Sequence, residues 1–233
     1  MLNIITLEAR KFKISGYFKN VLITDLIIGL GFWFMVYITP PQDIADSFAS
    51  FSAILIPKIE FVVRSVFIVF ASVLIGRLII EEYSNKTISI LFMYPIGRKT
   101  LMMSKLFIIA MFTFLSVVFS NILITCMLYL LNIIYPILRF DLTLPIAIKS
   151  LYSFFMSAIA TSGMSLIPLY FGMRKKSTTA AIISAVLMVV LLRIRIGSLS
   201  FNSIAAISIS LAVAGICAAY LSIRNIEHRD VNV

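Results

Sequence analysis

Six long runs of apolar residues constrain this chain of 233 residues more than any other feature. They can be drawn at 21–39, 59–80, 106–131, 148–171, 179–196 and 203–223. About 20 apolar residues in a helix cross a bilayer, and lipid cannot satisfy the backbone groups of an open structure. The strands of a membrane β-barrel alternate polar and apolar residues, and these runs show no such alternation. The sequence therefore predicts an all-α integral membrane protein with six transmembrane helices, forming a single domain over residues 1–233.

Composition and charge agree with that class. Hydrophobic residues make up 61% of the chain and charged residues only 13%, whereas a soluble domain has about a quarter charged. The net charge of +10 does not predict a nucleic-acid surface, because few residues lie outside the bilayer to form one. With both termini placed in the cytoplasm, 14 of the 20 lysines and arginines fall on the inner side. This bias predicts a multi-pass protein with both ends cytoplasmic.

The first twenty residues do not form a span. They mix apolar side chains such as Ile5 and Phe12 with basic ones such as Arg10 and Lys13. Such a mixture predicts an amphipathic helix over 1–20 that lies in the cytoplasmic interface, with its basic side toward lipid head groups. A disordered basic tail is the alternative.

The connection between the second and third runs, residues 81–105, carries far more charge than a simple link between two spans needs. Two acids begin it, a short amphipathic turn comes next, a proline breaks that turn, and basic residues lead into the next run. Its most informative residues are Glu81, Glu82, Thr87, Leu91, Pro95, Arg98 and Lys105. Because proline ends a helix, the segment is predicted to form a helix–break–helix structure in the cytoplasm.

The order of these residues resembles the cytoplasmic connection of ABC-2-type transporter permeases, the membrane subunits of bacterial ABC transporters. The resemblance also covers the N-terminal interfacial helix and the six spans, and so most of the chain. It implies a coupling helix that binds to a separate ATPase subunit, which is present in two copies. ATP and Mg are expected on that ATPase, and no cofactor is expected on this chain. It also implies a second permease copy or a related permease, and a location in the bacterial cell membrane.

The resemblance implies roles for the charged residues of the connection, and simpler interpretations stand beside them. Glu82 would lock the coupling helix to the N-terminal helix or to the ATPase. Arg98 would pair with acids of the partner or with lipid phosphates. The alternatives are a solvated helix end at Glu81 and Glu82, and anchoring of the topology by Arg98 and Lys105.

The sequence contains no Gly-x4-Gly-Lys-Ser/Thr loop for nucleotide phosphates. It also shows no metal cluster, nucleophile–base pair or carboxylate dyad. The chain is therefore expected not to be an enzyme, and the energy for transport is expected to come from another polypeptide.

Polar residues inside the runs are candidates for a translocation path, because each is costly in lipid unless it is paired. The candidates are Arg64, Asn121, Ser157 and Thr161. Arg64 is expected about one turn inside the outer end of its run, where it either snorkels to head groups or attracts substrate. Asn121 either bonds between helices or lines the path. Ser157 and Thr161 belong to a four-residue repeat, Ser153 to Ser165, whose alternative role is close helix packing, as for the small residues of the sixth run.

The predicted function is export of an amphipathic or hydrophobic cargo, and small permeases of this type suggest that the cargo is a peptide. The alternative is a membrane immunity or scaffold protein that does not transport. An ion-coupled carrier would bury acids in mid-membrane, and Asp25, expected near the inner end of the first span, is the only acid that clearly enters a run. Cys126 and Cys217 are expected to be buried free thiols.

Overall fold

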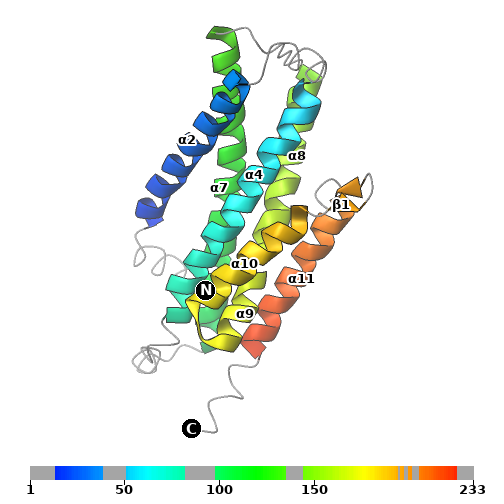
Figure 1. Cartoon of the computed structure of the whole chain (residues 1–233). Helices are drawn as coiled ribbons and strands as arrows, with labels where there is room; N and C mark the ends of the chain where they lie inside the picture. The colour runs from blue at the N-terminus through cyan, green and yellow to red at the C-terminus, as the bar shows by residue number, and fades with distance from the viewer. Residues whose placement is uncertain are drawn as a thin grey trace. The chain divides into compact units, whose positions relative to one another are not determined.

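The computed structural model describes residues 14–38, 51–81, 98–134, 144–193, 195–196, 199–200 and 205–224. Helices dominate this part of the chain (Figure 1). They are α2 (Ile14–Ile38), α4 (Phe51–Ile75), the π-helix η1 (Gly76–Ile80), α7 (Arg98–Ile134), α8 (Leu144–Met164), α9 (Ile167–Lys175), α10 (Thr178–Arg193) and α11 (Ala205–Arg224). An antiparallel pair of two-residue strands, β1 (Arg195–Ile196) and β2 (Leu199–Ser200), comes after α10 and was not predicted.

The predicted helical membrane fold is confirmed. Within the described residues, four helical stretches are long and apolar enough to cross a bilayer: Gly16–Met35, Leu55–Ile80, Thr100–Leu131 and Ala147–Lys175. Two shorter apolar helices, Thr178–Arg193 and Ile209–Ser222, coincide with the fifth and sixth predicted runs. Sixteen residues of α10 extend only about 24 Å. A helix that short spans a bilayer by local thinning or by snorkelling of a flanking residue such as Arg193.

The predicted interfacial helix lies partly outside the described residues. Residues 14–20 are described, and they form the beginning of α2, continuous with the first span. A separate interfacial helix over 1–20 therefore remains a prediction for residues 1–13 only.

The chain divides into two compact units, which are described separately. Unit 1 comprises Ser65–Phe114 and Ile159–Val233 together with the first 13 residues, and unit 2 comprises Ile14–Arg64 and Leu115–Ala158.

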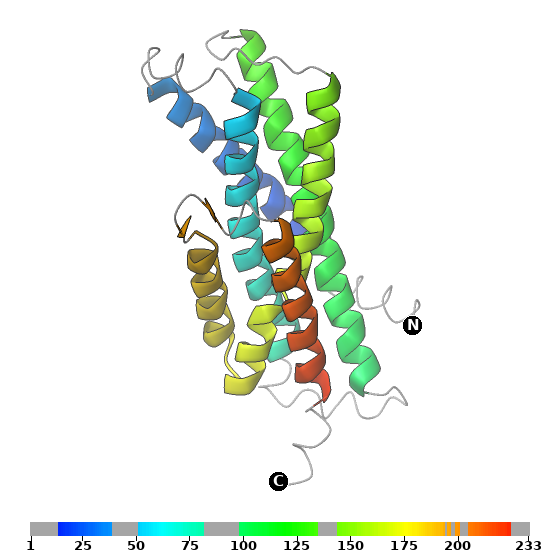
Figure 2. The same ribbon diagram turned by 90° about the vertical axis from the view of Figure 1, so that its right-hand side faces the viewer.

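In unit 1, the short helix α9 packs against α10, α11 and η1 (Figure 2). Glycines allow this close approach. A Cβ atom on Gly172 would lie 2.9 Å from the Cβ of Ala181 and would overlap the side chain of Ile80. At the end of α8, a Cβ on Gly163 would lie 2.6 Å from the Cβ of Ala212, and one on Gly215 would overlap the carbonyl of Gly163. Helices in lipid associate through such small residues because lipid offers little hydrophobic driving force.

The turn between α9 and α10 depends on a backbone conformation that glycine adopts most easily. Lys176 ends α9 in the left-handed region, with φ of 49°, and its backbone N–H donates to the carbonyl of Gly172. This bond satisfies one of the free carbonyls at the helix end. A residue with a Cβ atom is strained in this backbone conformation, whereas glycine adopts it without that cost in free energy.

Replacing Lys176 by glycine is therefore expected to stabilise the protein by up to about 1 kcal/mol, because it removes the strain at a positive φ. The same change at Lys175, the last residue of α9 itself, should destabilise the protein by a similar amount, because glycine is unfavourable in a helix. Both variants lose one positive charge, so the difference between their thermal unfolding midpoints in detergent isolates the backbone effect. Equal midpoints would contradict the expectation.

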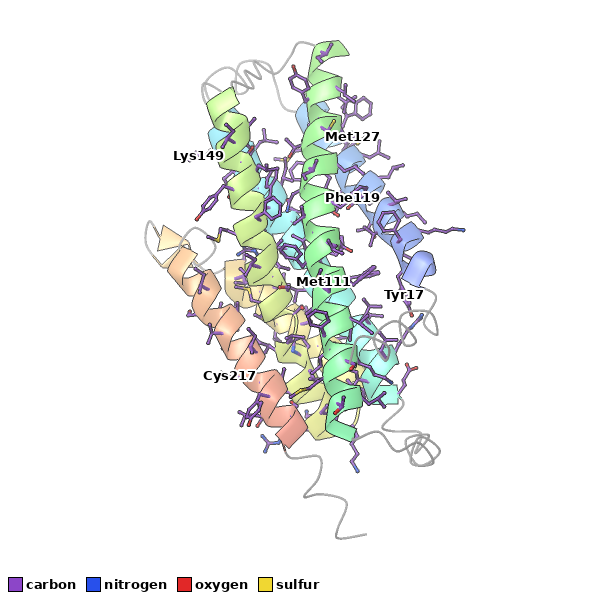
Figure 3. The ribbon with its side chains drawn as sticks, turned by 180° about the vertical axis from the view of Figure 1, so that it is seen from behind. Tyr17, Met111, Phe119, Met127, Lys149 and Cys217 are labelled. Carbon is purple, nitrogen blue, oxygen red and sulfur yellow. The ribbon has the colours of Figure 1, made fainter. Side chains whose placement is uncertain are left out.

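In unit 2, α2 runs beside α7, and α4 runs beside α8. The rings of Phe18 and Phe119 lie 5.5 Å apart, and a Cβ on Gly29 would lie 2.6 Å from the sulfur of Met127. Figure 3 labels Phe119 and Met127 on this part of α7. Since the residue numbers rise together on the two helices, α2 and α7 run in the same direction here, as alternating spans one and three should.

Candidate functional site

Most of the predicted ATPase-coupling residues fall on or beyond the limits of the described chain. Glu82, Thr87, Leu91 and Pro95 lie outside the described residues. Arg98 is the first residue of α7, and its side chain is likewise outside the description. Glu81 comes directly after η1 and is exposed, as a residue that meets a partner must be. Their coupling roles therefore remain predictions.

Lys105 is a predicted coupling residue with a side-chain contact that the structure defines. Its side chain is buried, and its Nζ donates a hydrogen bond of 3.2 Å to the backbone carbonyl of Leu78. Leu78 belongs to η1, where the N–H of Glu81 bonds to the carbonyl of Gly76 in the wide π pattern. Lys105 thus ties the beginning of α7 to the end of the second span. The two helices that flank residues 82–97 are linked at their ends, within unit 1.

The four residues predicted for the translocation path are all buried: Arg64, Asn121, Ser157 and Thr161. The structure brings two of them together, because Arg64 Nη2 donates a hydrogen bond of 3.1 Å to Ser157 Oγ. Asn121 donates from Nδ2 to the carbonyl of Val117, 3.0 Å away and one turn back on its own helix. The role of these residues as a path lining stays a prediction, since the chain itself covers them in the structure described.

Arg64 lies deeper in its span than the sequence suggested. The second predicted run begins at residue 59, but α4 begins at Phe51 and the apolar stretch at Leu55. Arg64 is therefore about two and a half turns inside the stretch, not one. Only 4% of its side chain is exposed, so the snorkelling interpretation does not describe this structure.

Glu60 was not among the predicted site residues. This acid lies one helical turn before Arg64 on α4, is only 9% exposed, and interacts with Arg64 electrostatically. The Ser153 hydroxyl of α8 lies beside its carboxylate. The second predicted run begins at residue 59, so Glu60 stands at its very edge. The signal that could have identified it was the four-residue spacing of an acid and a base within one helix.

These contacts form a polar ladder, which we define as Glu60 and Arg64 on α4 with Ser153 and Ser157 on α8. Glu60 meets Ser153, and Arg64 meets Ser157 one turn further along both helices. The residue numbers of the two contacts rise together on both helices, so α4 and α8 run in the same direction in unit 2 (Figure 1). An acid and a base of opposite charge on one helix, with hydroxyls of the neighbouring helix beside them, are a form in which charge is tolerated inside a bilayer.

A second group of buried polar side chains lies between α2 and α7, also in unit 2. Asp25 is fully buried on α2, and neither of its carboxylate oxygens accepts a hydrogen bond from the described residues. The Ser120 hydroxyl of α7 lies beside this carboxylate, although the two do not meet hydrogen-bond geometry. The apolar stretch of α2 runs from Gly16 to Met35, so Asp25 lies at its middle. The expectation that Asp25 lies near the inner end of the span was wrong, because α2 begins at Ile14 and not near residue 21.

Two further expectations are corrected. Asp25 is not the only acid inside a span, since Glu60 is another. Cys126 and Cys217 are free thiols, as expected, but both are exposed on the surface of the chain and not buried. Cys217 is labelled on α11 in Figure 3. Among the described residues, no group of three or more histidine, cysteine or acidic side chains could hold a metal ion.

Residues 4–192 match the model of a protein family described as ABC-2 family transporter protein. The chain is also 40% identical over 230 residues to the uncharacterized protein YcbO of Bacillus subtilis (strain 168). That match covers 98% of this chain and 100% of YcbO. No solved structure matches the chain. The family match spans the segment 81–105 and the polar ladder.

Proposed function

Because the chain belongs to the family of ABC-2 transporter proteins, and so is a membrane subunit of an ABC transporter, we propose that it exports an amphipathic or hydrophobic cargo with energy from a separate ATPase. Two ATPase subunits dock on residues 81–105, and a second permease, identical or related, completes the assembly. Both termini lie in the cytoplasm. The observation that carries this proposal is the family match over residues 4–192, which includes the whole connection.

The contact of Lys105 supports a coupling role for the connection. A force on residues 82–97 reaches the membrane through the two helices at their ends. Lys105 Nζ bonds to the Leu78 carbonyl, so the end of the second span and the start of α7 move together when the connection moves. The exposed Glu81 at the end of η1 supplies a charge that a partner can pair with. The chain has no phosphate-binding loop of its own, which agrees with hydrolysis on another chain.

The cargo class is argued from the polar content of the spans. Charged side chains in the described spans are few, and two of them, Glu60 and Arg64, attract each other electrostatically. A path built from such helices offers mostly apolar surface, which suits an amphipathic or hydrophobic molecule and not a strongly charged one. A peptide with an apolar face fits this description.

A membrane protein that binds such a molecule without transporting it is the second candidate. The burial of all four predicted path residues favours it, because a path open in this structure would expose them. Co-purification separates the two candidates. A transporter subunit purifies together with its ATPase, and its cargo stimulates ATP hydrolysis by that complex. A scaffold protein purifies without an ATPase and shows no such stimulation.

Reversing the charge of Glu82 tests the coupling. In the purified complex of this chain with its ATPase, Glu82→Lys is expected to reduce cargo-stimulated ATP hydrolysis about tenfold, as the loss of about 1.4 kcal/mol of docking energy would. Lys149→Glu is the matched control, since it too reverses one charge; Lys149 is exposed and lies at the end of a run that the count of basic residues places on the outer side. Both variants should insert into the membrane normally. Unchanged hydrolysis and transport in Glu82→Lys would contradict the role given to this residue.

A further inference from the structure

One side of the short helix α9 combines an aromatic ring with two positive charges. Phe171, Arg174 and Lys175 are all exposed, and their spacing of three and four residues places them on the same side of the helix. The opposite side, which includes Leu169 and Gly172, is buried where α9 packs against α10, α11 and η1. The side that bears Phe171 is therefore left open by the helices that hold α9 in place.

The positions of these side chains along the span match the layers of a membrane surface. The apolar stretch Ala147–Lys175 ends at Lys175, so both cations stand where hydrocarbon gives way to head groups. Phe171 lies one turn earlier, toward the hydrocarbon, and is 48% exposed. Its ring lies edge-on to that of Tyr170, with 5.6 Å between the ring centroids. A phospholipid presents its groups in the same order, with acyl chains first and then a phosphate.

The end of α9 is also strongly positive. Arg174, Lys175 and Lys176 are consecutive and exposed. Glu81 is the only acid among the described residues of unit 1, to which α9 belongs. Lys176 keeps a basic side chain at a left-handed position that glycine adopts at lower cost in free energy. This group of cations therefore attracts an anion and repels the choline group of a neutral lipid.

We propose that Phe171, Arg174 and Lys175 form a binding site for one anionic phospholipid, such as phosphatidylglycerol. The guanidinium of Arg174 and the ammonium of Lys175 donate hydrogen bonds to the phosphate oxygens, and an acyl chain lies along the ring of Phe171. A lipid suits this site better than a free phosphate ion, because only a lipid contacts the aromatic part as well. The site needs neither an ATPase nor a cargo, so it does not depend on the proposed function.

The test uses the full chain, without ATPase or cargo, in micelles of a non-ionic detergent with equal amounts of phosphatidylglycerol and phosphatidylcholine. Native mass spectrometry of the complex with one lipid should show that phosphatidylglycerol is retained preferentially. Arg174→Gln should lower this preference about fivefold, and Arg174→Gln with Lys175→Gln about 25-fold, because each basic residue contributes a factor of about five. A phosphatidylglycerol with a photoreactive acyl chain should label the peptide that contains Phe171.

The matched control is the double variant Lys58→Gln with Lys149→Gln, which also removes two exposed cations, from α4 and α8. Like the cations of α9, Lys149 has an exposed aromatic neighbour, Tyr152, on its own helix. The control should keep the full preference for phosphatidylglycerol, and inorganic phosphate added at the lipid concentration should not displace the lipid. All these changes affect exposed side chains, and the single variant Arg174→Gln still decides if a double variant fails to fold.

Three results would each overturn the proposal. The first is equal retention of the two lipids by the unaltered chain. The second is an equal loss of preference in the two double variants, which would reflect net charge and not a site. The third is displacement of phosphatidylglycerol by inorganic phosphate, which would identify the ligand as a free anion.

Discussion

Replacing Arg64 by methionine is expected to destabilise the protein by about 3–5 kcal/mol, because the change leaves Glu60 buried without its basic neighbour. It also removes the hydrogen bond from Arg64 to Ser157 that joins α4 to α8. For a chain of this length, the thermal unfolding midpoint in detergent should fall by roughly 10 °C.

A double variant distinguishes two causes of the lost stability, the loss of packing and the uncompensated charge of Glu60. Glu60→Gln together with Arg64→Met removes both charges and keeps side chains of similar length, so it should recover most of the lost stability. Lys58→Met is the control, since Lys58 lies on the same helix and is exposed; its midpoint should hardly change. Equal instability of Arg64→Met and the double variant would show that Glu60 gains no stability from its basic neighbour.

Adding one methyl group at Gly215 is the second large effect expected. Gly215→Ala places a Cβ against the backbone carbonyl of Gly163, so α8 and α11 must move apart. Overpacking of this kind costs about 1–3 kcal/mol, and the high end applies here because backbone atoms cannot rotate away as a flexible side chain would. The unfolding midpoint should fall accordingly.

Gly31→Ala is the same chemical change in a different environment. No atom lies within 4 Å of a Cβ built on Gly31, so the alanine variant should be as stable as the original or slightly more stable. The contrast between the two variants tests helix contact alone, since both replace a helical glycine by alanine. Equal midpoints for Gly215→Ala and Gly31→Ala would show that α8 and α11 do not approach as closely as described.

The helical type and the positions of the apolar segments could be predicted because lipid restricts the possible structures so strongly. The apolar runs locate six helices, and the expectation that small residues of the sixth span pack closely is confirmed at Ala212 and Gly215. These conclusions need only the length and composition of each run. They do not depend on which helices are neighbours.

Helix boundaries were less predictable, and the errors affected the candidate site. Pro57 and Lys58 precede the second predicted run, which begins at residue 59, yet α4 continues through Pro57. Proline is tolerated inside a membrane helix when neighbouring groups satisfy the freed carbonyl. Moving the boundary back to Phe51 places Glu60 inside the span and sets Arg64 deeper. The pairing of Arg64 with Ser157 could not be predicted at all, because it joins residues 93 positions apart on helices whose adjacency the sequence does not specify.

The π-helix η1 has a consequence for how the chain tolerates changes in length. A single π turn is equivalent to one residue inserted into an α-helix, and each added residue rotates the rest of the helix by about 100° about its axis. Deleting one residue within Gly76–Ile80 would let the turn relax to ordinary α geometry while Glu81 keeps its direction. The same deletion within Phe51–Ile75 would turn Glu81 and the start of the connection toward a different side. The π-helix can therefore lose one residue without changing the direction in which Glu81 and the connection after it leave the second span.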